Sequence, residues 1–198
     1  MRKILLVIGL VFGSFQFSQA QFIHGIGMTA SGLFGRISKY SAFGGSSYDF
    51  SMSQFSFAYF PRYNFVENDN SSVSVGAPVA LGAGIASNSY SGDASFYFAY
   101  EVPVVLDYNI GLKSTEDNDN GFGGYIGAGF SYYHVGMSES MSADFNGTTY
   151  GPLLRGGVRF HIPSKNDDPK VMSLGIFYKK GMESTKLTTI GFNLIVDL

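Results

Sequence analysis

The stretch that decides the fold is SFYFAYEVPVVLDYNI, residues 95–110 of a 198-residue chain. Because successive side chains of a β-strand point to opposite faces, these residues divide into two sets. One set is apolar throughout and consists of Phe96, Phe98, Tyr100, Val102, Val104, Leu106, Tyr108 and Ile110. The other set is mixed and contains Glu101 and Asp107. The stretch therefore predicts one long strand with an unbroken apolar face.

Aromatic side chains stand at both ends of that apolar face, and aliphatic side chains lie mainly between them. The core of a water-soluble protein gives no reason for such banding. A bilayer does, because amphipathic rings collect at its two interfaces. We therefore expect this strand to cross a membrane.

The first twenty residues have the layout of a secretory signal peptide. Arg2 and Lys3 form a basic start, residues 4–13 are an apolar run, and Ser18 and Ala20 supply the small residues before a cleavage site. Ten apolar residues are too few to span a bilayer. We expect residues 1–20 to be a cleavable signal peptide and residues 21–198 to form one outer-membrane β-barrel domain.

Composition narrows the class further. Charged residues make up 14% of the chain, against roughly 25% in soluble domains, while aromatic residues reach 16%. After the signal peptide no apolar run reaches eighteen residues, which argues against a membrane-spanning helix. A closed barrel is the non-helical structure that satisfies its backbone in lipid.

Charge and cysteine content exclude other classes. Without Arg2 and Lys3 the chain has 11 of its 13 basic residues against 15 acidic ones, a net charge of −4. A nucleic-acid partner would require a basic stripe, so none is expected. The chain has no cysteine, which excludes disulfides, thiolate metal sites and lipoprotein anchoring.

Eight strands are expected along the mature chain. They cover residues 22–37, 52–66, 72–86, 95–110, 121–134, 148–162 and 171–181, and the segment after residue 184. Arg36 orients the first strand, since a charge should avoid lipid. Pro61 cannot donate to a strand ladder and predicts a bulge in the second strand.

The connections alternate in character. Segments 67–70, 113–120 and 163–169 are rich in Asn, Asp and Glu, whereas 40–49, 87–94 and 136–147 are loops rich in Gly, Ser or Tyr and 182–184 is a short hairpin. Short periplasmic turns and longer external loops are typical of outer-membrane barrels. The acidic turns are therefore expected in the periplasm and the other set outside the cell.

The face opposite the apolar one consists mainly of Gly, Ser and Ala with isolated charges. Those charges are Arg62, Glu101, Asp107, Arg155, Arg159 and Lys179. A surface facing water would be rich in Lys, Glu and Thr, whereas small residues beside long ones suit a narrow interior. We therefore predict an all-β, eight-stranded, antiparallel up-and-down transmembrane β-barrel. A soluble secreted barrel that binds an apolar ligand is the alternative.

Buried charges are tolerated only when they are paired. We expect an interior polar cluster in which Glu101 and Asp107 pair with Arg155, Arg159 or Lys179. The cluster is interpreted as structural. Its functional alternative is a narrow channel or small-solute carrier that uses these charges, because charge inside a membrane often marks a pathway.

One motif resembles a known family. The segment YEVPVVL, residues 100–106, followed by Asp107 and Tyr108, resembles the Glu-Ile-Pro-Leu-type strand of the small outer-membrane β-barrel domain family, which contains OmpA-like and PorT-like barrels. The segment GYIGAG, residues 124–129, is similar to a later strand of that family. The resemblance implies an outer-membrane barrel that the insertion machinery assembles. The chain departs from the pattern because it ends in Leu198 rather than an aromatic residue.

A lipid-modifying enzyme is a further alternative, because such enzymes also use eight-stranded barrels. His134 ends a strand near Ser138, Glu139 and Ser140, and a lipase-like site needs a serine and an acid in reach of the histidine. The matching strand position is Gly136, so a serine would have to fold back. A histidine at the rim is more often an interfacial polar residue, and no enzymatic activity is expected.

No cofactor or metal site is expected either. The segment DNDNG, residues 117–121, resembles a calcium loop, but its glycine comes one position early and the glutamate of the twelfth position is missing. It is interpreted as a polar turn. His24, His134 and His161 are widely separated and form no metal signature.

The sequence therefore predicts a non-enzymatic protein of the outer membrane, with a membrane-structural, binding or adhesion role. Binding would use the external loops, whose Tyr, Ser, Gly and Asn residues are adaptable. The expected partners are outer-membrane lipid, the barrel-insertion machinery and a protein or surface ligand at the loops.

Overall fold

The structure is a computed structural model that describes residues 21–41, 44–88, 94–115, 117–137, 147–162, 170–183 and 187–198. The predicted signal peptide lies outside the described residues. Within them, no helix is long and apolar enough to cross a membrane.

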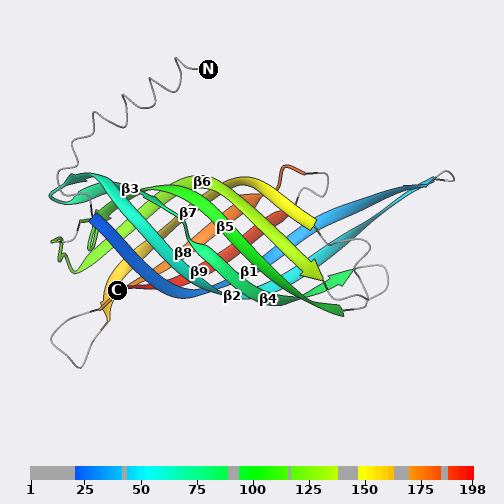
Figure 1. Cartoon of the computed structure of the whole chain (residues 1–198), viewed down its shortest axis with the longest axis horizontal. Helices are drawn as coiled ribbons and strands as arrows, with labels where there is room; N and C mark the ends of the chain where they lie inside the picture. Colours follow the sequence, from blue (N-terminus) through cyan, green and yellow to red (C-terminus); the bar gives the residue numbers. More distant parts are fainter. Residues whose placement is uncertain are drawn as a thin grey trace, which may run out of the picture.

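The described residues form nine strands of one antiparallel sheet (Figure 1). The strands are β1 (Gln21–Ser41), β2 (Gly44–Asn68), β3 (Ser71–Gly76), β4 (Val79–Asn88), β5 (Ala94–Gly111), β6 (Phe122–Met137), β7 (Gly147–Ile162), β8 (Lys170–Lys180) and β9 (Thr188–Asp197). Because β1 pairs with both β2 and β9, the sheet closes into a ring.

Strands β3 and β4 together occupy one position in that ring. Both lie between β2 and β5, and both keep a single register against β5, from Gly76 opposite Val105 to Ala80 opposite Glu101. The nine strands therefore make a ring of eight, which confirms the predicted fold, whereas the predicted strand of residues 72–86 is interrupted at residues 77 and 78.

The interruption between β3 and β4 has a local cause at Pro78, which has no N–H to donate. Ala77 N–H donates to the Pro61 carbonyl at 3.0 Å, and Val79 N–H donates back to the Ala77 carbonyl at 2.8 Å. The bulge predicted at Pro61 is wrong in position, since Pro61 keeps its pairing with His24. The register of β2 against β3 shifts further along, between residues 64 and 66.

The alternation predicted from the sequence decides which side chains face outward. Along β5, Phe98 is 66% exposed whereas Val105 is 1% exposed, and the two sets alternate over the whole strand. The same division holds along the middle of β2, β4, β6, β7, β8 and β9, where most exposed side chains are aromatic or aliphatic. The barrel therefore has an apolar outer face, and its lumen holds polar and charged side chains beside two apolar clusters, one that includes Leu33 and Tyr97 and one that includes Phe60, Val105 and Ile195.

The first strand is oriented opposite to the expectation from Arg36. Phe22, Met28 and Phe34 are exposed and Leu33 is fully buried, so Arg36 shares the outward face. Its guanidinium donates to the carboxylate of Asp49 at 2.7 Å, and this hydrogen bond lowers the pKa of Asp49. The inference failed because Arg36 lies past Phe34, the last residue of β1 that pairs with β9, and a charge there has no lipid to avoid.

The loop predicted at residues 40–49 is also wrong, because β1 runs to Ser41 and β2 begins at Gly44. Among the described residues, the two strands pair only with each other beyond Phe34 and Phe50. Residues 35–41 and 44–49 thus form a two-stranded ribbon that projects past the rest of the barrel (Figure 1). At about 3.3 Å per residue, the seven residues of β1 in it extend about 23 Å.

Candidate functional site: the polar interior of the barrel

Glu101 of β5 and Lys179 of β8 meet inside the barrel, which confirms the expected pairing of this carboxylate. The ammonium nitrogen lies 2.5 Å from Glu101 Oε2, and both side chains are about nine-tenths buried. The Ser131 hydroxyl donates to the other carboxylate oxygen at 2.7 Å. Lys179 also lies 4.7 Å from the centroid of the Phe177 ring. Both carboxylate oxygens of Glu101 thus have a partner, and these contacts connect β5, β6 and β8.

Asp107 is paired more weakly. Its carboxylate lies 3.6 Å from Arg155 Nε, beyond hydrogen-bond distance, and within the described part of the chain neither carboxylate oxygen has a hydrogen-bond partner. Gly127 allows the close packing, since a Cβ there would lie 1.9 Å from Asp107 Oδ1. The Arg155 guanidinium lies 4.5 Å from the Phe60 ring centroid and 4.7 Å from that of Tyr125. Cation–π contacts therefore supplement a loose ion pair.

Arg159 hydrogen-bonds to neither of the two expected carboxylates. Its Nη2 donates to Asn109 Oδ1 at 2.6 Å, and its Nη1 donates to the Lys113 carbonyl at 3.4 Å. The Asn109 amide in turn donates to the hydroxyls of Ser72 and Ser74. Arg159 thus belongs to a hydrogen-bond network near the short turns rather than to an ion pair.

A further ion pair joins Arg62 and Asp197, which the sequence did not single out as a pair. Arg62 Nη2 lies 3.1 Å from Asp197 Oδ2, and both side chains are buried. Alternation places both residues on the inward face. Their contact, across 135 positions of sequence, exists only because the ring closes through β1.

The connection between β5 and β6 folds across one end of the lumen. Gly111 and Lys113 have positive φ angles of 71° and 53°, and Leu112 and Ser114 are fully buried. The Lys113 carbonyl accepts hydrogen bonds from Arg62 and Arg159. This segment is a polar turn as predicted, and its described residues pack against the arginines at that end of the lumen.

The residues of the DNDNG segment are held by amide hydrogen bonds. The Asn118 and Asn120 side-chain amides both donate to Asn70 Oδ1, at 3.1 and 2.6 Å. Asp119 Oδ1 lies 3.1 Å from His161 Nε2. Among the residues that the structure describes, no three His, Cys, Asp or Glu side chains come close enough to hold a metal ion.

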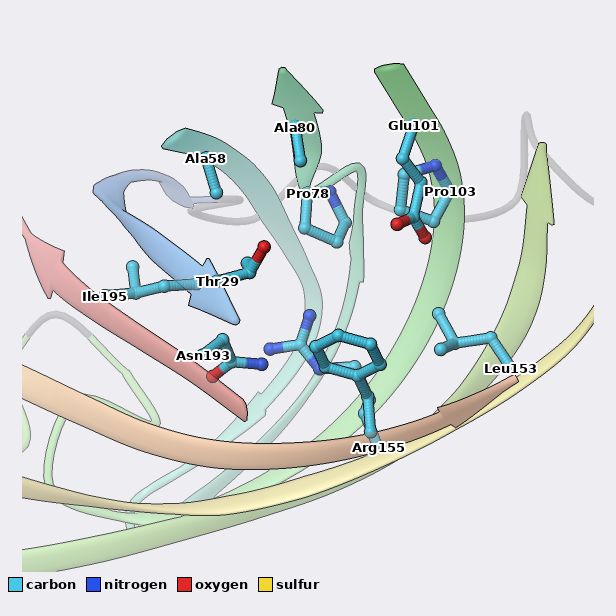
Figure 2. Close-up of a pocket in the computed structure, with 11 residues that line it drawn as sticks. Thr29, Ala58, Pro78, Ala80, Glu101, Pro103, Leu153, Arg155, Asn193 and Ile195 are labelled. Carbon is cyan, nitrogen blue, oxygen red and sulfur yellow. The ribbon is translucent and has the colours of Figure 1, made fainter. Parts of the chain in front are cut away.

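Side chains of the described residues project into the lumen and leave small cavities between them. One cavity has a volume of about 30 Å³, and Figure 2 shows Glu101, Arg155 and Asn193 projecting into it from β5, β7 and β9. A second hollow of about 20 Å³ lies beside Lys179 and Tyr133. Each is room for one or two water molecules. The interior has the filled character expected of eight strands.

His134, the residue proposed for the enzymatic alternative, contacts Thr148 and Tyr100. Its Nδ1 lies 3.1 Å from the Thr148 hydroxyl oxygen, and its ring centroid lies 5.1 Å from that of Tyr100. Ser138, Glu139 and Ser140 lie outside the described residues.

An antiparallel ring with an apolar outer face and a filled polar lumen is the architecture of small barrels that cross outer membranes. The protein is a transmembrane β-barrel of this class.

No family model and no curated protein matches the sequence. Among solved structures, the chain is similar to Neisserial surface protein A, NspA, with 12% identity and a TM-score of 0.49 over 91% of this chain and 99% of that one. It is similar to the outer membrane protein OprG of Pseudomonas aeruginosa, with 10% identity and a TM-score of 0.49 over 89% and 92%. It is also similar to Ail, the attachment invasion locus protein of Yersinia pestis, with 14% identity and a TM-score of 0.44 over 89% and 95%.

Proposed function

We propose that this protein is a non-enzymatic barrel of the bacterial outer membrane that binds an extended segment of a partner protein through its projecting β1–β2 ribbon. The ribbon of residues 35–41 and 44–49 is the observation that carries the proposal. Its location outside the cell is supported by the short turn of residues 69 and 70, which lies at the opposite end of the barrel from the ribbon, because short turns of such barrels face the periplasm.

The backbone of the ribbon supplies the binding chemistry. The last pairs that tie it to the barrel are Phe34 with Thr188 and Phe50 with Asn88. Beyond them, in residues 35–41 and 44–48, each strand has one edge whose N–H and C=O groups pair with no described strand. Such an edge is a template for a further strand, and main-chain hydrogen bonds give the affinity in this mode of recognition.

The interior gives less support to the channel alternative. The described lumen holds cavities of about 30 and 20 Å³, and the β5–β6 connection covers one end. A hydrated ion path needs a continuous space wider than isolated water sites. We expect the purified protein to show no conductance in planar bilayers; a steady current that Glu101→Gln alters would favour the channel instead.

The experiment is a selection of unstructured peptides displayed on phage against the protein in lipid nanodiscs. A truncated variant, in which residues 36–49 are replaced by Asn-Gly, removes the ribbon and leaves the paired barrel. Peptides enriched on the full chain are expected to lose binding on the truncated variant. N-methylation of one of the two sets of alternate backbone amides of a selected peptide should abolish binding, because only that set donates hydrogen bonds to the ribbon.

The truncated variant must still shift mobility on heating in a gel, which reports a folded barrel. Equal enrichment of peptides on the full and the truncated protein would contradict the proposal. So would selected peptides that keep their affinity in both cases, when the two sets of alternate amides are N-methylated one at a time.

A further inference from the structure

The outer face of the barrel is not uniformly smooth. A groove of about 580 Å³ crosses β2, β4, β5 and β6, and its lining is almost entirely apolar. Its phenylalanine and leucine side chains are strongly exposed, from 51% for Phe55 to 66% for Phe98. This groove is separate from the ribbon and from the polar lumen.

The register explains why the groove is there. In one row across the strands, Phe55 lies opposite Ala83, Ala83 opposite Phe98, and Phe98 opposite Gly136. Large and small residues thus alternate along the row, and a hollow forms at each small one. In the neighbouring row, which contains Leu81, every side chain is large, and these side chains line the groove beside the hollows.

We propose that this groove is a binding site for one acyl chain of a membrane glycerophospholipid. It is continuous with the apolar face of β5, so hydrocarbon is the medium that reaches it. Water does not fill an apolar hollow of this kind. If the hollow were empty, the side chains that line it would lose dispersion contacts. A chain resting on Ala83 between the Phe55 and Phe98 rings restores those contacts.

The groove also has a polar edge for the rest of the lipid. His134 and Tyr100 supply the only polar side chains among the described residues that line it. When the Thr148 hydroxyl donates to His134 Nδ1, the hydrogen of the ring is on Nε2. That N–H can donate to an ester or phosphate oxygen of the lipid whose chain lies in the groove.

The test uses the full chain in phosphatidylcholine nanodiscs that contain a trace of phosphatidylcholine with a diazirine on one acyl chain. After irradiation, mass spectrometry of the peptides locates the label. We expect the label to concentrate on the β4 and β5 peptides that contain Ala83 and Phe98. Ala83→Phe should reduce labelling of these peptides about five-fold, because the added ring occupies the hollow.

Ala128→Phe is the matched control, since Ala128 is an exposed, outward-facing alanine of β6 that does not line the groove. It should leave the labelling pattern unchanged. Ala83→Leu, a smaller filling, should give an intermediate loss and guards against a misfolded Ala83→Phe variant.

Label spread evenly over all outward-facing strands of the wild-type protein would overturn the proposal, as would an Ala83→Phe variant that folds and is labelled like wild type. The variant lacking the ribbon should keep the pattern. The proposal that the ribbon binds a partner and the proposal that the groove binds an acyl chain can therefore fail independently.

Discussion

Replacing Lys179 with methionine leaves a carboxylate buried without its cation. Methionine keeps the length of the side chain, so little packing is lost, but Glu101 retains only the Ser131 hydroxyl. Breaking a buried ion pair by removing one partner costs about 3 to 5 kcal/mol. Because this pair keeps about a tenth of its surface in contact with solvent and Ser131 remains, we expect about 3 kcal/mol, roughly a hundredfold in the folding equilibrium.

The assay is reversible urea unfolding of the refolded protein in detergent micelles, followed by far-ultraviolet circular dichroism. Glu101→Gln alone should cost a similar amount. The double variant Glu101→Gln/Lys179→Met should cost less than the sum of the two by about 2 kcal/mol, because neither charge is then left alone. Lys180→Met, at an exposed neighbour, should stay within about 0.5 kcal/mol of wild type.

The reasoning fails if Lys179→Met unfolds at the same urea concentration as the wild type. Strict additivity in the double variant would equally refute it, since the two side chains would then stabilise the barrel independently. Both outcomes would mean that the pair is solvated in the folded protein.

Three further outcomes are expected in the same unfolding assay. Gly127→Ala should lower the free energy of unfolding by about 2 kcal/mol, because its Cβ displaces the Asp107 carboxylate, whereas Gly121→Ala, with nothing within 4 Å, should have no effect. Asp107→Asn should cost less than about 1 kcal/mol, since that carboxylate accepts no hydrogen bond and Arg155 keeps its contacts with the Phe60 and Tyr125 rings. Arg62→Ala should cost about 3 kcal/mol by leaving Asp197 buried and unpaired, and limited proteolysis should then cut faster between β5 and β6.

Much of this fold could be predicted from residue alternation alone. Each strand has a period of two, so Phe98 and Val105 reveal their faces without any knowledge of the neighbouring strands. The number of strands follows from counting such segments. Gly/Ser-rich composition, however, does not distinguish a loop from a ribbon whose strands are held by backbone pairing, and this is why residues 40–49 were misassigned.

The orientation of β1 failed for a related reason. The rule that charge avoids lipid applies only inside the apolar band, and the sequence does not show where the band ends. Arg36 lies beyond it and pairs with Asp49. The alternation of Phe22, Met28 and Phe34 carried the correct signal, but glycines between them weakened it.

The sequence predicts which residues belong to the polar cluster, but only partly which acidic residue pairs with which basic one. Alternation placed Glu101, Asp107, Arg155, Arg159 and Lys179 on the inward face, where the structure has them. Which acid meets which base depends on the offset between strands that are distant in sequence, and no local pattern encodes that offset. The pairing of Arg62 with Asp197 is therefore visible only once the ring is closed.

The break at Ala77 and Pro78 is a place where the barrel wall should bend more easily than elsewhere. In the register that continues through the break, Pro78 faces Pro103 on β5, so neither residue has an amide hydrogen to share across that gap. On its other side the break is tied to β2 through the single bond to Pro61. A barrel wall under lateral strain bends most easily where the fewest hydrogen bonds join its strands. Bending of this wall in a fluctuating bilayer should therefore be concentrated at Pro61, Pro78 and Pro103.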